Sequence, residues 1–259
     1  MTQALSFPLL HPRFFVASPL PRGGALPLAF SLDENAATHL RVLRLQEGET
    51  ITLFDGDGGE FCASIAAIGK REVMVNLLEH FSLERESPLN LTLVQALATG
   101  DKMDWIIQKA TELGVTAIEP IQTARATAKL SGDRVEKRAQ HWQAVATAAC
   151  EQCGRNRVPA VHPLLDFQAW IARKQHTNSF LLHPDAEGDL LTSIKPIAAQ
   201  GVALLIGPEG GFAPEEIAAA RRAGVQALRF GPRVLRTETA GIAALAALQT
   251  AFGDLTAHA

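Results

Sequence analysis

Residues 204–212 read LLIGPEGGF, and residues 228–239 read LRFGPRVLRTET. Each stretch begins as an apolar strand, breaks at a Gly-Pro pair and leads within a few residues into a helical pattern. Strand, glycine loop and helix in succession are how α/β proteins form a ligand crevice at the ends of their strands. We therefore expect both loops to border one crevice. These loops alone do not identify the ligand, so the remaining sequence features must be considered.

Length and composition set the class of protein. The chain has 259 residues, 47% of them hydrophobic and 20% charged, which is typical of a globular protein with room for two domains. The net charge of -3 argues against a diffusely basic nucleic-acid coat. Three cysteines, no signal-like start and no apolar run of about 18 residues favour a cytoplasmic protein that does not enter a membrane.

The first part of the chain is rich in strand patterns. A hairpin is predicted across 50–65, with its turn at 55–59, and a helix is predicted from Asp33 to Leu43. Several short strands in so short a segment favour a small β-barrel domain at 1–78. The polar stretch 79–88 ends in proline and is the predicted linker.

From residue 89 onward strands and helices alternate. The stretch 91–97 is almost continuously apolar, as in a strand buried on both faces of a sheet. Repeated strand-helix units predict an α/β domain at 89–259 with a mostly parallel sheet. Further strands are expected near 115–121, 179–183, 202–206 and 225–230, and helices at 101–113, 133–153, from Pro214, and from Thr237 or Thr239.

The first Gly-Pro loop does not match the known phosphate-binding patterns. A P-loop requires a lysine and a hydroxyl after its last glycine, where this chain has Phe212 and Ala213. The dinucleotide fingerprint requires Gly-x-Gly-x-x-Gly at the first strand-helix turn of its domain, and this loop lies late and lacks the spacing. Glycines that let a flat ligand approach the backbone favour a nucleoside. Two tight turns without a ligand remain an alternative.

Arginines and a cysteine pair are the other candidate features. Five arginines and no acid lie between Glu216 and Glu238, and guanidinium groups suit phosphates and base edges. Exposed helix faces and helix caps are the alternative for many arginines of this chain. Cys150 and Cys153 have the spacing of half a zinc site, but the second half is missing and the pair ends a helix, which argues against metal or redox chemistry.

In several segments the chain resembles the bacterial 16S ribosomal RNA (uracil-N3) methyltransferases of the SPOUT class. The matching segments occur in the family's order over nearly the full length, which is far more specific than one glycine loop. They are 41–44, 54–56, 85–89, 107–115, 149–159, 205–211 and 231–239.

The resemblance implies a fold and partners. The first domain would be a PUA-like RNA-binding β-barrel, and the second a SPOUT methyltransferase domain whose C-terminal part forms a trefoil knot around S-adenosylmethionine. The substrate would be a uridine of 16S ribosomal RNA or of the small ribosomal subunit, and the protein would be a homodimer without a metal. The knot follows from the resemblance alone, because most protein connections are unknotted.

The resemblance also implies which residues bind the cofactor, whereas the roles of Arg236 and Glu209 follow from the chemistry of methyl transfer to uracil N3, and the RNA-binding arginines are suggested by their charge and position. Arg236 would stabilise the uracil anion, and Glu209 would orient Arg236, accept the proton or only secure the loop. An enzyme acting on transfer RNA or on a ribose 2′-OH, and a non-catalytic RNA-binding assembly protein, remain alternatives. The cofactor set is Leu182, His183, Ile206, Gly207, Pro208, Glu209, Gly210, Gly211, Leu228, Phe230, Gly231, Val234, Leu235 and Thr237, and the RNA set is Arg13, Arg41, Arg44, Arg155, Arg157 and Arg233.

Overall fold

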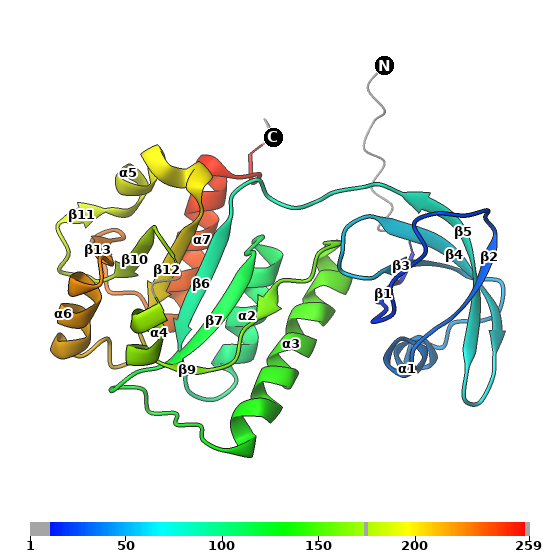
Figure 1. Cartoon of the computed structure of the whole chain (residues 1–259), viewed down its shortest axis with the longest axis horizontal. Helices are drawn as coiled ribbons and strands as arrows, with labels where there is room; N and C mark the ends of the chain where they lie inside the picture. The colour runs from blue at the N-terminus through cyan, green and yellow to red at the C-terminus, as the bar shows by residue number, and fades with distance from the viewer. Residues whose placement is uncertain (1–10, 174–175, 257–259) are drawn as a thin grey trace. The chain divides into compact units, whose positions relative to one another are not determined.

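The computed structural model describes residues 11–173 and 176–256 (Figure 1). The chain forms two compact units. One consists of Met1–Glu86 together with Cys150–Val158, and the other of Ser87–Ala149 together with Pro159–Ala259. The first unit is therefore completed by a short segment that lies far along the chain.

The first unit is built on a five-stranded sheet in the order β1-β3-β4-β5-β2. The predicted hairpin is present, and the helix α1 begins after Asp33, whose carboxylate accepts a hydrogen bond from the Ala36 N–H at 2.9 Å. β1 runs parallel to β3, and the other pairs are antiparallel. The last strand of this sheet, β5, extends to Phe81 and so enters the predicted linker 79–88. The elements are β1 (Arg13–Phe15), β2 (Leu28–Ser31), α1 (Glu34–Val42), β3 (Thr50–Phe54), β4 (Glu60–Ile68) and β5 (Val73–Phe81).

The second unit contains an eight-stranded sheet in the order β11-β13-β10-β12-β6-β7-β8, with β9 also paired to β7. All of these pairs are parallel, which confirms the predicted α/β class. The three shortest strands, of two residues each, are not visible in the sequence pattern as such. The strands are β6 (Leu91–Ala96), β7 (Ala117–Gln122), β8 (Ala160–Val161), β9 (Leu165–Asp166), β10 (Ser179–Leu182), β11 (Gly188–Asp189), β12 (Val202–Ile206) and β13 (Gln226–Arg229).

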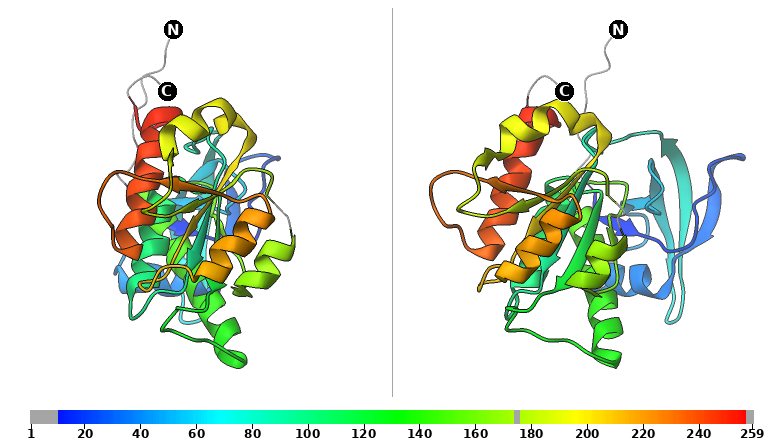
Figure 2. Two further views of the ribbon diagram at one scale, coloured as in Figure 1. Left: turned by 90° about the vertical axis from the view of Figure 1, so that its left-hand side faces the viewer. Right: turned by 60° about the vertical axis from the view of Figure 1, so that its left-hand side comes forward.

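Helices cover both faces of this sheet, as the two further views show (Figure 2). On β12, Leu204 and Ile206 belong to the core that includes residues of α2, α5 and α7, whereas Ala203 and Leu205 belong to the core beneath α4 and α6. This alternation explains why the strand is apolar throughout. The helices are α2 (Lys102–Glu112), α3 (Asp133–Cys153), α4 (Phe167–Arg173), α5 (Leu190–Ile194), the 3₁₀ helix η1 (Lys195–Gln200), α6 (Pro214–Arg222) and α7 (Thr237–Phe252).

The strand order brings distant loops together. The chain passes from β10 to β11 at one edge, returns to β12 on the other side of β10, and then runs back to β13. Because the strands are parallel, the loops that follow β10, β12, β6 and β7 all start on the same side of the sheet, at the carboxyl ends of the strands. None of the helices within the described ranges is long and apolar enough to cross a membrane.

Candidate active site

A hollow of about 550 Å³ lies where the loops after β10 and β12 meet the start of α7. Most residues that the resemblance assigns to the cofactor line it, and so does Arg236. Three predicted residues, Leu228, Phe230 and Gly231, do not line the hollow. The Leu228 side chain is fully buried, but its backbone carbonyl accepts a hydrogen bond from the N–H of the lining residue His183 at 2.9 Å. The predicted lining residues are Leu182, His183, Ile206, Gly207, Pro208, Glu209, Gly210, Gly211, Val234, Leu235, Arg236 and Thr237.

The conformation of the first Gly-Pro loop explains its glycines. Gly211 has φ +67°, a backbone region that favours glycine, and its N–H closes a turn onto the Pro208 carbonyl at 2.9 Å. A Cβ on Gly210 would lie 3.2 Å from Cβ and the carbonyl oxygen of Arg125. The loop is therefore packed against the segment that follows β7, which local sequence patterns do not reveal.

A buried hydrogen-bond chain fixes the entrance of α7 to this loop. The Gln95 side-chain amide donates to the Thr237 hydroxyl at 3.0 Å, and this hydroxyl donates to the Gly207 carbonyl at 2.6 Å. Gln95 is completely buried and Thr237 is 5% exposed. Buried polar groups are costly when unpaired, so this chain holds three elements in one arrangement.

Glu209 is held by the loop after β6. Its Oε1 accepts hydrogen bonds from the Thr99 N–H, the Thr99 hydroxyl and the Lys102 ammonium, at 3.0, 2.7 and 2.9 Å. Burial alone would raise the pKa of Glu209, but these donors outweigh it and lower the pKa to about 2. A carboxylate with this pKa is a weak base near neutral pH, and the arrangement favours the loop-securing role over proton acceptance.

Three cations line the hollow, and two of them lie outside the predicted set. Lys102, at the start of α2, pairs with Glu209 and Glu238 at 2.9 and 3.3 Å. Arg125, after β7, donates to the Gly210 carbonyl at 3.3 Å. Over the described ranges, Arg236 makes no side-chain hydrogen bond or ion pair and is exposed at the N-cap of α7. Both added residues lie within a few residues after a strand, Lys102 at the start of the helix that follows β6 and Arg125 in the loop after β7, and that position is the signal that would have found them.

Two of the predicted RNA-binding arginines are buried inside the first unit. Arg13 is 5% exposed, forms an ion pair with Glu60 and donates to Asn156 Oδ1 at 2.6 Å. Burial by itself raises the pKa of Glu60, but hydrogen bonds from Arg85 and Arg13 outweigh it, so the pKa of Glu60 lies below its usual value. Arg155, also 5% exposed, pairs with Glu86. This placement favours a structural role for Arg13 and Arg155.

The remaining predicted RNA contacts are more accessible. Arg157 is half-exposed and pairs with Glu84 at 2.8 Å. Arg41 donates to the Gly69 carbonyl at 2.9 Å, whereas Arg44 and Arg233 are exposed. Arg233 does not line the hollow although it lies in the second Gly-Pro loop.

The cysteine pair ends α3, as its position in the sequence predicts. Burial raises the pKa of the Cys150 thiol to about 12, so this group is not a ready thiolate. Over the described ranges, no group of three or more His, Cys, Asp or Glu side chains has the arrangement to hold a metal ion.

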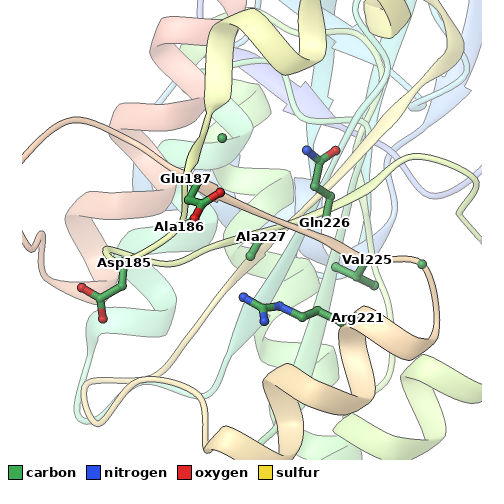
Figure 3. Close-up of a pocket in the computed structure, with 9 residues that line it drawn as sticks. Asp185, Ala186, Glu187, Arg221, Val225, Gln226 and Ala227 are labelled. Atoms are coloured by element: carbon green, nitrogen blue, oxygen red, sulfur yellow. The ribbon is translucent and has the colours of Figure 1, made fainter.

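A second hollow, of about 540 Å³, lies beside β11 and β13 (Figure 3). Arg221 reaches from α6 toward Ala227, and the exposed Asp185 and Glu187 border the same space. None of the residues assigned from the sequence to the cofactor or to RNA lines it. Both Gly-Pro loops instead border the first hollow, which we therefore take as the candidate active site.

Comparison with known families gives two matches. Residues 85–249 match the RNA methyltransferase domain, and residues 32–78 match the RNA methyltransferase PUA domain. The candidate active site lies within the first match. The second match confirms the prediction that the first part of the chain is a PUA-like domain.

Relatives cover nearly the whole chain. Ribosomal RNA small subunit methyltransferase E of Bacillus subtilis is 34% identical over 85% of this chain and 89% of its own. The crystal structure of the Neisseria gonorrhoeae ribosomal RNA small subunit methyltransferase E, bound to S-adenosyl methionine, is 38% identical, with a TM-score of 0.88 over 95% of this chain and all of that one. A Legionella pneumophila structure of a putative methyltransferase with bound cofactor SAM is 37% identical, with a TM-score of 0.87 over 95% and 99% of the two chains. On this sequence and structural similarity, the chain belongs to the RNA methyltransferase family that includes these ribosomal RNA small subunit methyltransferases E.

Proposed function

We propose that this protein transfers a methyl group from S-adenosylmethionine to N3 of a uracil in 16S ribosomal RNA. The observation that supports this most directly is the hollow bordered by both Gly-Pro loops, in a chain of this family. The Neisseria and Legionella proteins, similar over almost the full chain, were crystallised with this cofactor.

The residues present fit such a cofactor. The absence of a Cβ at Gly210 lets the loop pack closely against Arg125, and the hollow is within the range of about 300–1,000 Å³ typical of ligand sites. Apolar side chains of Leu182, Ile206 and Leu235 line it beside exposed peptide groups. This mixture suits an adenosine held by backbone groups. The bound cofactor would supply an electrophilic methyl group on a sulfonium.

Catalysis would then rest on orientation and charge. The residues of this chain would align N3 of the uracil, which would lose its proton to water, with the methyl group that the cofactor supplies, and the sulfur would leave with the electrons of the carbon–sulfur bond. Arg236, an exposed cation without an internal partner over the described ranges, would stabilise the negative charge of the deprotonated uracil. Glu209 would secure the loop through Thr99 and Lys102 and leave the proton to solvent.

Methyl-group mapping tests the proposal directly. The purified protein is incubated with isotope-labelled S-adenosylmethionine and either free 16S RNA or small ribosomal subunits, and the RNA is digested and analysed by mass spectrometry. We expect one labelled N3-methyluridine. A label on a ribose, on a different base or only on transfer RNA would refute the proposed reaction, and no label with either substrate would refute an enzymatic function on this RNA.

Three further features belong to the proposal through the family resemblance. We expect a homodimer, a trefoil knot in the C-terminal unit and a cytoplasmic location. RNA would contact the first unit at Arg41, Arg44 and Arg157 and the second near Arg233, since these side chains, unlike those of Arg13 and Arg155, are not buried. Sedimentation equilibrium checks the dimer, because a single species at the mass of one chain would exclude it.

A further inference from the structure

Arg125 is a lining residue of the candidate active site that the family resemblance did not supply. It follows β7, and its guanidinium lies at the hollow with one hydrogen bond, to the Gly210 carbonyl at 3.3 Å. A guanidinium offers five N–H donors, so most of its donors have no partner over the described ranges. Its side chain is exposed.

The backbone beneath Arg125 is held firmly. The neighbouring Ala124 N–H donates to Glu216 Oε1 at 2.8 Å, and the Ala213 N–H donates to Glu216 Oε2 at 2.8 Å. Glu216 is 6% exposed, so this carboxylate ties the end of β7 to the start of α6. Together with the close approach of Gly210, this places the base of the Arg125 side chain at a fixed point against the Gly-Pro loop.

The charges around the hollow set Arg125 apart from Lys102. The ammonium of Lys102 is compensated by Glu209 and Glu238, whereas Arg125 has no acidic partner among the described residues. An uncompensated guanidinium beside a ligand site is suited to an anionic oxygen, which it binds in a fork. Val234, which lines the same hollow, is 82% exposed and offers an apolar surface for a base.

We propose that Arg125 is a substrate-positioning residue that binds an anionic oxygen of the RNA at the entrance of this hollow. The oxygen belongs either to a phosphate beside the target uridine or to a carbonyl of the deprotonated uracil. Because the guanidinium also contacts Gly210, it sets the RNA at a constant distance from the loop proposed to hold the cofactor. The inference rests on the proposed function and adds a role that the function alone does not require.

The test uses the full chain carrying Arg125→Ala or Arg125→Lys, with Arg222→Ala as the control for removal of an exposed arginine that does not line the hollow. Four quantities are compared: KM for RNA, kcat, the salt dependence of RNA binding, and the dissociation constant of S-adenosylmethionine by calorimetry. We expect Arg125→Ala to raise KM or lower kcat by roughly tenfold or more, as loss of a charge-assisted contact does. Cofactor binding should stay close to that of the parent protein.

The pattern of losses identifies the oxygen. A phosphate contact predicts a higher KM, a salt slope reduced by about 1 and partial rescue by lysine. A contact to the uracil anion predicts a lower kcat, a kcat-pH profile displaced to higher pH and little rescue, because a point charge does not reproduce the fork.

Two results would overturn the inference. One is equal weakening of cofactor binding and of turnover, which would show that Arg125 only supports the loop. The other is a variant that behaves as Arg222→Ala does. In both cases the parent protein still methylates the RNA, whereas failure of the parent protein itself would refute the proposed function instead.

Discussion

Arg236 is the single residue on which the proposed chemistry depends most. The change Arg236→Ala removes the cation next to the uracil anion, so we expect the single-turnover rate to fall about 100-fold or more, as it does when one donor to a developing negative charge is lost. The dissociation constant of S-adenosylmethionine should hardly change. Rapid-quench methylation assays and calorimetry measure the two quantities.

Arg236→Lys and Arg222→Ala serve as controls for this change. Lysine keeps the charge and should retain part of the rate, and removal of the exposed Arg222 should leave it unaltered. Proportional losses of rate and cofactor affinity in Arg236→Ala would remove its catalytic role and make it part of the cofactor site.

Glu209 gives a prediction that depends on pH. Its pKa lies at about 2 in the folded protein, below the ordinary 4.5, so ionised Glu209 stabilises the fold above about pH 4.5 and this contribution disappears as the pH falls toward 2. Because the side chain is 30% exposed, we expect Glu209→Gln to cost only about 1–2 kcal/mol at neutral pH. Urea unfolding of both proteins between neutral and acidic pH should show the difference shrinking. The prediction would be contradicted if this difference in unfolding free energy did not change with pH, or if Glu209→Gln cost no more than Glu187→Gln, a change at an exposed carboxylate.

Among the residues of the candidate active site, the sequence predicted those that belong to a recognisable local pattern. Gly210 and Gly211 were found because their pattern lies in one short stretch that follows a strand. Lys102 and Arg125 lie about one hundred residues away along the chain and reach the same hollow only because parallel strands end at one edge. Arg13 was predicted to face RNA, but its side chain is buried against Glu60. This burial depends on contacts between residues far apart in the sequence, which a local pattern does not reveal.

Glu216 couples two elements that a reading of periodicity treats separately. In the sequence it is one of two acids just after Pro214, where a helix was expected to begin, whereas the structure shows its carboxylate accepting hydrogen bonds from the Ala124 and Ala213 N–H groups at 2.8 Å each. Glu216→Ala leaves both donors without an acceptor, and we expect a loss of roughly 2–4 kcal/mol in the free energy of unfolding. Urea denaturation measures it, and amide hydrogen exchange at Ala124 and Ala213 should accelerate.

Glu215→Ala is the matched control, since it removes an exposed carboxylate from the same helical turn. Glu216→Gln keeps one carbonyl oxygen and should fall between the two. If Glu216→Ala were no less stable than Glu215→Ala, the coupling of β7 to α6 through this carboxylate would be refuted.

For the molecule as a whole, the alternation of strands and helices was sufficient to predict the parallel sheet, because βα units allow few arrangements. Which segments of the chain belong to each unit was not predictable in this way. The sequence suggested two consecutive domains joined at 79–88, whereas β5 continues to Phe81 and Cys150–Val158 belongs to the first unit. What joins this segment to the unit is a set of buried polar contacts between residues far apart in sequence. The knot stays a prediction.

These contacts make the first unit dependent on a distant segment. Asn156 accepts from Arg13 at 2.6 Å and donates to the Leu83 carbonyl at 2.9 Å, and Arg85 donates to the Gly154 carbonyl at 3.0 Å. A fragment of residues 1–86 keeps the ion pairs of Glu60 with Arg13 and Arg85, but it lacks the hydrogen-bond partners that Asn156 and Gly154 provide. Hydrogen bonds to charged groups contribute about 1.5–3 kcal/mol each, so losing several of them removes a large part of the about 5–15 kcal/mol that stabilises a domain. We therefore expect the isolated fragment not to fold cooperatively.

Circular dichroism and NMR spectra of the fragment check this expectation against the full chain. Asn156→Ala in the full chain is the graded test: it removes the Arg13 and Leu83 contacts but keeps the segment, and should cost about 1–3 kcal/mol in urea unfolding. Asp57→Asn, a change at an exposed turn of the same unit, should cost less than half as much. A fragment with dispersed amide signals and a cooperative transition would show that the first unit is independent of Cys150–Val158, and the polar cluster would then be an addition to a fold that stands without it.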